Sequence, residues 1–152
     1  MGSYDSTGET LEHIRIVQSL MREAMLNLMM RSQQHDRSKL LSPEKAMFDE
    51  FTPKLRELTY GSPEYKATLD AMGPALAHHY AVNDHHPDHA AGGIGAMTLL
   101  SLIEMLCDWR AAGMRHADGD FGTSLRINRD RYGISDQLYG ILLNTAHELG
   151  WI

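Results

Sequence analysis

Histidines are the residues of this sequence whose type and spacing most clearly suggest chemistry. The chain has nine, and five of them fall within twelve residues: His78, His79, His85, His86 and His89. Neutral imidazole is a common ligand of transition metals. The segment therefore predicts a metal site, with a solvated histidine-rich turn as the alternative.

Three positions outside this segment could supply further ligands. His35 and Asp36 place an imidazole beside a carboxylate at a predicted helix end, where they can hold one cation. His13 lies on the inner side of the first predicted helix, where a histidine bonded to a backbone carbonyl is the alternative. Asp108 lies on a mostly apolar helix, with Glu104 one turn before it. Because a buried bare carboxylate is costly, Asp108 needs a cation or, alternatively, an arginine.

Helix geometry relates the clustered histidines to one another. On a continuous helix they occupy two adjacent faces, one with His79, Asn83 and His86 and the next with His78, Val82, His85 and His89. Pro87 is expected to end this helix at Asp84 to His86. Which of the five histidines bind metal stays open at this point.

The elements that must position these residues all have helical signals. Apolar residues repeating at three and four positions predict a first helix from about Leu11 to Gln33. Ser42-Pro43-Glu44 and Ser62-Pro63-Glu64 are typical helix starts, with a serine cap and an early proline. Thr52-Pro53 is a third, weaker start, and Gly73-Pro74 predicts either two helices or one sharp kink.

The second half of the chain continues in the same way. Gly92-Gly93 predicts a loop, after which Thr98 caps an apolar helix that reaches about Ala112. Two more helices are expected, over residues 123–131 and 135–149, with Gly150 as a C-terminal cap. Sustained two-residue alternation and hairpin turns are absent. We therefore expect an all-α fold, one compact multi-helix domain over residues 1–152 with residues 1–9 as a disordered tail.

Composition limits the partners. The net charge of −6 argues against a nucleic-acid-binding face, although a small phosphorylated substrate is compatible with it. No apolar run reaches the roughly 18 residues that a membrane span requires. The one cysteine, Cys107, excludes an internal disulfide and fits a reducing compartment. We expect a cytoplasmic protein without nucleic-acid or membrane partners.

The order of these residues resembles the HD superfamily of metal-dependent phosphohydrolases, whose signature is His, then His-Asp, then a distant Asp. Here His13 precedes His35 by 22 residues, and Asp108 follows Asp36 by 72. His-Asp-Arg-Ser-Lys is similar to the His-Asp-x-x-Lys variant, although Ser38 replaces a glycine usual in it. Together with the histidine-rich segment and Met-Leu-Cys-Asp-Trp, it resembles an HD-like family of bacteria and phages.

The resemblance implies roles for particular residues. The metal ligands would be His13, His35, Asp36, His79, His85 and Asp108, binding one or two Mn, Co, Ni, Fe or Zn ions. Asp36, Lys39 and Glu104 would be the catalytic group, Glu104 by orienting a ligand or water. Lys39, Asn83 and His86 would contact a small phosphorylated substrate, a nucleotide by analogy. Pairing into a homodimer is also implied.

Two alternatives to hydrolysis remain. HD-type proteins include di-iron oxygenases, and a histidine-rich site suits that chemistry. The domain could also be a metal-stabilised helical binding module without activity.

Overall fold

Local helix signals account for the secondary structure of the chain, here seen in a computed structural model that describes residues 4–59, 61–115 and 119–152. Within those residues every regular element is helical and no strand occurs, which confirms the all-α prediction. The chain divides into two units, Met1–His35 and Asp36–Ile152, and each is described by itself. The extent of a single domain over residues 1–152 stays a prediction.

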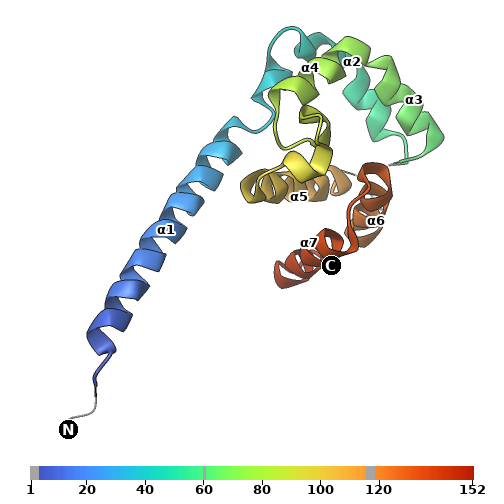
Figure 1. The fold of residues 1–152 in the computed structure, drawn as a ribbon. Helices are drawn as coiled ribbons and strands as arrows, with labels where there is room; N and C mark the ends of the chain where they lie inside the picture. The colour runs from blue at the N-terminus through green and yellow to red at the C-terminus, as the bar shows by residue number, and fades with distance from the viewer. Residues whose placement is uncertain (1–3, 60, 116–118) are drawn as a thin grey trace. The chain divides into compact units, whose positions relative to one another are not determined.

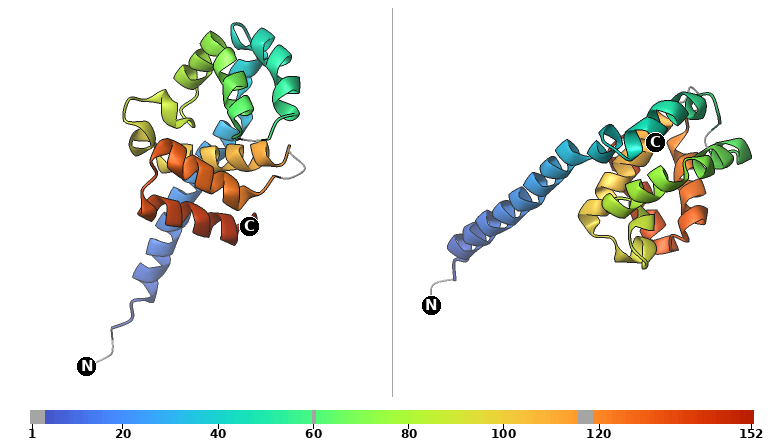
Figure 2. Two further views of the ribbon diagram at one scale, coloured as in Figure 1. Left: turned by 90° about the vertical axis from the view of Figure 1, so that its right-hand side faces the viewer. Right: turned by 90° about the horizontal axis from the view of Figure 1, so that it is seen from above.

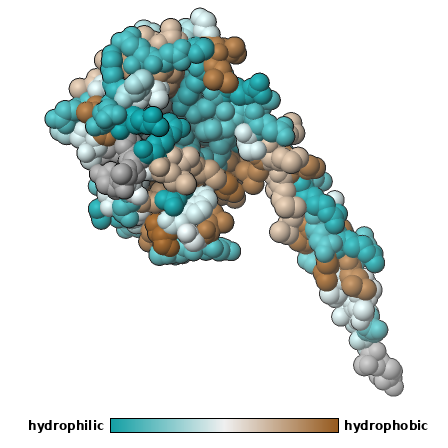
Figure 3. All heavy atoms as spheres, turned by 180° about the vertical axis from the view of Figure 1, so that it is seen from behind, coloured by the Kyte–Doolittle hydropathy of each residue, from teal (hydrophilic) through white to brown (hydrophobic). Residues whose placement is uncertain are grey.

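The first unit is one helix. Helix α1 spans Thr7–Gln34 and starts four residues earlier than predicted, so residues 7–9 of the expected tail are helical; residues 1–3 lie outside the described part. Asp5 Oδ1 accepts a hydrogen bond from the Thr7 N–H at this start (3.0 Å). None of the residues of α1 is buried, and apolar side chains alternate with polar ones along it (Figure 3).

The second unit begins with a series of short helices (Figure 1). In chain order they are the 3-10 helix η1 (Arg37–Leu40), α2 (Glu44–Arg56), α3 (Pro63–Ala71), α4 (Gly73–Val82), and the 3-10 helices η2 (Pro87–His89) and η3 (Gly93–Ala96). The Ser62 hydroxyl accepts from the Tyr65 N–H at the start of α3, as its sequence predicts (3.1 Å). Helix α3 ends at Ala71 and α4 begins at Gly73, which confirms the expectation of two helices there.

Two predicted helix starts are wrong in detail. Helix α2 does begin at Glu44, but Pro43 holds the cap position and no side chain caps the helix. Thr52-Pro53 starts nothing, because Pro53 lies inside α2. Its ring removes one backbone donor, and packing of α2 against η1, α3 and α4 compensates for that loss.

The apolar core of the second unit lies among its last three helices, α5 (Leu99–Gly113), α6 (Phe121–Tyr132) and α7 (Asp136–Glu148), which stack against one another in Figure 2. Side chains of Thr98, Asp120 and Ser135 cap their starts. Gly150 follows α7 with φ of +66°, the left-handed conformation of a C-terminal cap. The buried core consists of Leu102, Met105, Leu106, Trp109, Phe121, Leu125, Ile134, Leu142 and Ala146.

No helix within residues 4–59, 61–115 and 119–152 is both long enough and apolar enough to span a bilayer.

Candidate metal centre

The histidine-rich segment forms a site because its helix stops early. Helix α4 ends at Val82, two to four residues before the predicted end, and Asn83 has an extended backbone with φ of −118°. On a continuous helix His86 would lie about 10 Å along the axis from His79. Instead the chain turns back, and the His86 N–H bonds to the Asn83 carbonyl (3.3 Å). The predicted helix end at Asp84 to His86 is therefore two to four residues too late, and the turn is what brings His79 and His86 together.

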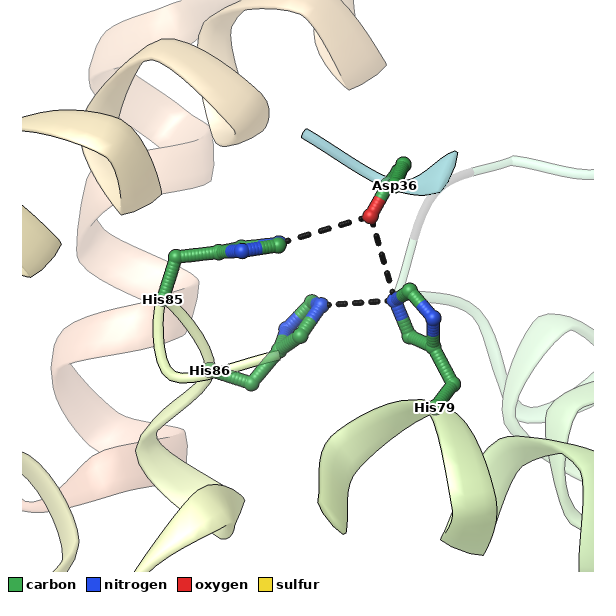
Figure 4. A group of neighbouring side chains, drawn as sticks. All are labelled: Asp36, His79, His85 and His86. Atoms are coloured by element: carbon green, nitrogen blue, oxygen red, sulfur yellow. Dashed lines mark hydrogen bonds and ion pairs between the residues drawn. The ribbon is translucent and has the colours of Figure 1, made fainter. Parts of the chain in front are cut away.

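Asp36, the first residue of the second unit, contributes a carboxylate to the site. Its backbone is left-handed, with φ of +57°, and its carbonyl accepts from the Lys39 N–H (3.0 Å), which closes η1. Aspartate tolerates this conformation better than most residues, although it still costs about 1–3 kcal/mol. The strained turn directs the Asp36 carboxylate toward the histidines (Figure 4).

Four ligand atoms converge on one point. Asp36 Oδ1 lies 3.3 Å from His79 Nε2 and 3.5 Å from His85 Nε2. His79 Nε2 lies 2.8 Å from His86 Nε2, and ligand atoms of all four residues fall within 4.8 Å of one another. In a four-coordinate site with bonds of about 2.0–2.1 Å, neighbouring ligand atoms are about 3.3 Å apart. The two separations from Asp36 match this spacing, whereas the 2.8 Å contact between His79 and His86 is a hydrogen bond that would have to lengthen. The four residues could hold a single metal ion with three nitrogen ligands and one oxygen ligand.

Carboxylates behind two of the imidazoles fix their orientation. Glu44 Oε2 accepts from His79 Nδ1 (2.9 Å), and Glu104 Oε1 lies 3.1 Å from His85 Nδ1. A carboxylate can only accept, so each Nδ1 carries a proton and Nε2 faces the ligand cluster, where it contacts the Asp36 carboxylate and where a bound metal ion would replace any proton on Nε2. Such pairing of a histidine ligand with a carboxylate is the usual support of a metal site.

Glu44 is the most buried charged residue of this arrangement. Its side chain is 0 % exposed, and His79 and His85 are 1 % and 2 % exposed. Besides His79 it accepts hydrogen bonds from His78 Nδ1 (2.7 Å) and from the Ser38 hydroxyl (2.9 Å). A buried carboxylate is stable only when its oxygens are satisfied in this way. Glu44 thereby joins the start of α2, the end of α4 and η1 at one point.

The Asp36 carboxylate stays ionised. Burial works to raise its pKa, but hydrogen bonds from His79 and His85, together with the Lys39 ammonium, outweigh burial and hold the pKa far below its usual range. The Lys39 Nζ lies 2.5 Å from Asp36 Oδ2, on the side away from His79 and His85. The site therefore presents an ionised carboxylate oxygen beside the Nε2 atoms of three histidines.

A cavity adjoins this cluster. It measures about 220 Å³, and its lining includes Asp84, His86, Thr98 and Ser101. The Ser101 hydroxyl donates to Asp84 Oδ2 (3.3 Å).

The chain matches DUF5662, described as a family of unknown function, over residues 2–148. The chain belongs to this family. No curated protein and no solved structure matches it. All four ligand residues lie inside the DUF5662 match, and because the family description gives no activity, the functional argument depends on the site itself.

In this DUF5662 protein the other predicted site residues lie at several places. Asp108 is on α5, close enough that its charge acts on His86. Asn83, predicted to contact substrate, donates to the Ser38 hydroxyl (2.9 Å) and the His79 carbonyl (2.8 Å). His86, given the same role, joins the ligand cluster instead. The roles of these residues remain predictions.

The two remaining predicted ligands belong to the first unit. His13 lies on α1, and His35 is the residue at which that helix ends. Their metal-binding roles stay predictions. In the histidine-rich segment, His78 bonds Glu44 and His89 Nδ1 lies 3.1 Å from the Tyr80 carbonyl, so neither belongs to the four-residue cluster.

Sequence reasoning missed Glu44 as a site residue. Its position after Ser42-Pro43 was interpreted as an acid at a helix start, which is correct but incomplete. The signal for a second role was the combination of apolar residues and two histidines in α4, because a buried imidazole needs a hydrogen-bond acceptor, for which a carboxylate is one choice.

Acid is expected to destabilise the metal-free protein. Burial lowers the pKa of His86 from its ordinary 6.5 to about 3, helped by charge on His85 and His79 and opposed by Asp108 and Asp36. Between these two pH values the unfolded chain binds a proton that the folded chain does not, so stability is lost as pH falls through the interval. The slope is at most about 1.4 kcal/mol per pH unit for this residue.

Urea unfolding of chelator-treated protein at pH 7, 6, 5 and 4 measures this slope. His86→Gln should flatten it, because glutamine does not titrate. An equal slope in the variant would assign the acid sensitivity to other groups.

Proposed function

We propose that this protein is a metal-dependent phosphohydrolase of the HD type that acts on a small phosphorylated substrate, with nucleotides as the first candidates. The observation that carries the proposal is the convergence of Asp36 Oδ1 with Nε2 atoms of three histidines. A cation of the protein, Lys39, lies next to this cluster, and a small cavity adjoins it.

The ligand chemistry favours certain metals. Three imidazoles and one carboxylate suit Mn, Fe, Co, Ni or Zn better than Mg or Ca, which prefer oxygen ligands. When bound, such an ion would supply a water of lowered pKa and polarise a phosphoryl oxygen.

The residues of the chain have separate parts in this proposal. Glu44 and Glu104 hold His79 and His85 in the ligand orientation. The Lys39 ammonium pairs with Asp36, so its charge would stabilise negative charge that develops on a phosphoryl oxygen bound beside Asp36. The Lys39 side chain is 27 % exposed and is therefore accessible to a ligand. Asn83 and Ser38 fix the backbone of the two segments that meet here.

Phosphate release tests the proposal. Chelator-treated protein is supplied with Mn, Co, Ni, Zn or Mg and a panel of nucleoside mono- and triphosphates. Release with at least one metal is expected, and Asp36→Ala and Asp36→Asn should each lose it. Asparagine is the sharper variant because it tolerates the left-handed backbone, so its circular dichroism and melting should stay close to wild type.

The outcomes are distinct. Unchanged turnover in Asp36→Asn would discard the mechanism. Absence of release with every metal would discard the hydrolase proposal.

The three-histidine cluster also favours one second candidate, an iron-dependent oxygenase. Iron retained on purification, together with oxygen consumption and no phosphate release, would select it. Strict manganese- or cobalt-dependent hydrolysis would exclude it.

A further inference from the structure

A second cavity lies in the same unit, apart from the ligand cluster. It measures about 310 Å³ and is formed by side chains of α3, α4 and α6. None of Asp36, His79, His85 and His86 lines it. Small-molecule sites generally start at about 300 Å³, so this hollow has room for a ligand of mononucleotide size and not for a much larger one.

Its walls suit a flat, apolar ring. Tyr65 from α3 and Tyr80 from α4 both line it, as do the aliphatic Leu69, Leu76 and Ile127. Aromatic and aliphatic side chains of this kind stack on planar heterocycles, because every such ring has an apolar face. The shape and lining therefore favour a planar aromatic group over an extended sugar or peptide.

Its charge suits an anion. Two cations, Lys66 and Arg131, line the hollow against one carboxylate, Asp70, in a chain whose net charge is −6. A local excess of positive charge on an acidic protein attracts small anions selectively. Arg131 is held in place by a hydrogen bond with Tyr80 and by its stacking on Tyr132, 4.7 Å from the ring centre. Arginine is well suited to phosphate because its planar group offers paired donors.

One buried polar group completes the lining. Asn128 is 1 % exposed, and its side-chain amide donates to the Ser124 carbonyl (3.1 Å), which fixes the plane of the amide. Asparagine amides in fixed orientations are frequent readers of the hydrogen-bonding edge of a nucleobase. Ring stacking, a fixed amide and two cations thus occur together on one hollow.

We propose that this hollow binds a nucleoside monophosphate or an anion of the same build, with the ring between the two tyrosines and the phosphate at Lys66 and Arg131. The site is distinct from the ligand cluster but adjacent to it. Tyr80 lines the hollow, and its ring also lies 4.9 Å from the ring of His86, centre to centre.

Binding is tested without any metal, on chelator-treated wild-type protein, in which the Asp36 carboxylate repels a phosphate at the ligand cluster. Calorimetric titration compares AMP and UMP with adenosine, ribose 5-phosphate and inorganic phosphate. Lys66→Ala and Arg131→Ala remove the two cations, and Arg126→Ala is the matched control, since Arg126 lies on α6 outside the hollow. Lys66 is exposed, so that variant should fold normally.

A mononucleotide is expected to bind at least about tenfold more tightly than either of its halves, and each cation variant to weaken it by about tenfold, the size of one charged hydrogen bond. Arg126→Ala should bind like the parent. Equal affinity for ribose 5-phosphate and AMP, no binding of any mononucleotide, or an equal loss in Arg126→Ala would each overturn the inference. Because no turnover is measured, failure here leaves the proposed hydrolase untouched, and failed hydrolysis leaves this result untouched.

Discussion

Replacement of Glu44 by glutamine is expected to weaken metal binding by about 10- to 100-fold, the usual effect of losing the support behind a histidine ligand. Glu44 accepts from His78, His79 and Ser38 at once. The glutamine amide keeps the size but presents two N–H donors to groups that also donate. His79 must then change its tautomer or turn, which moves its lone pair away from the ligand cluster.

Competition titration with Zn or Co against a chromophoric chelator measures this affinity. Glu50→Gln is the matched control, because Glu50 lies on the same helix and pairs with the exposed Lys54. Glu44→Ala is expected to destabilise the fold itself by about 3–5 kcal/mol, since it leaves buried donors without a carboxylate. Wild-type affinity in a well-folded Glu44→Gln protein would show that His79 needs no such support.

Replacement of Lys39 by methionine is expected to lower the rate of phosphate release by about 10²- to 10³-fold, as for the loss of other groups that stabilise developing negative charge. This prediction depends on the proposed hydrolase. Methionine keeps the length and the contact with Phe48, over whose ring Nζ lies at 4.9 Å, but removes the charge. The loss should fall on kcat more than on KM, because that charge is needed most in the transition state.

Two comparisons sharpen this experiment. Lys39→Arg should recover part of the rate. Lys45→Met should have no effect, because Lys45 is exposed and pairs with Asp49 on α2. Wild-type turnover in Lys39→Met would remove this residue from the mechanism.

Much of the helical fold could be predicted because its signals are local. Ser62 and Thr98 cap helices as expected, and Gly150 follows the last one. Pro53 misled the prediction because a proline inside a helix is tolerated only through packing that sequence patterns do not show. The histidine-rich segment was identified by residue type, but the early end of α4 was not, since Pro87 lies five residues beyond it.

The site was predictable in composition and not in detail, because burial is a property of the whole fold. Asp36, His79 and His85 were expected as ligands and do lie together. The role of Glu44 in orienting His79 depends on its contacts with His78 and His79, which are 34 and 35 residues away in the sequence. Those contacts arise from how α2 packs on α4, which no local pattern in either helix reveals.

The sequence distance across the ligand cluster has a consequence for folding kinetics. Ser38 and Asn83, which lie beside Asp36 and the histidines, are 45 residues apart, and α2, α3 and α4 separate them. Contacts of such long range form late, after most of the chain entropy has been lost. A bound ion would thus stabilise the native state more than the folding transition state. Its effect would appear chiefly as slower unfolding, with the rate of folding almost unchanged.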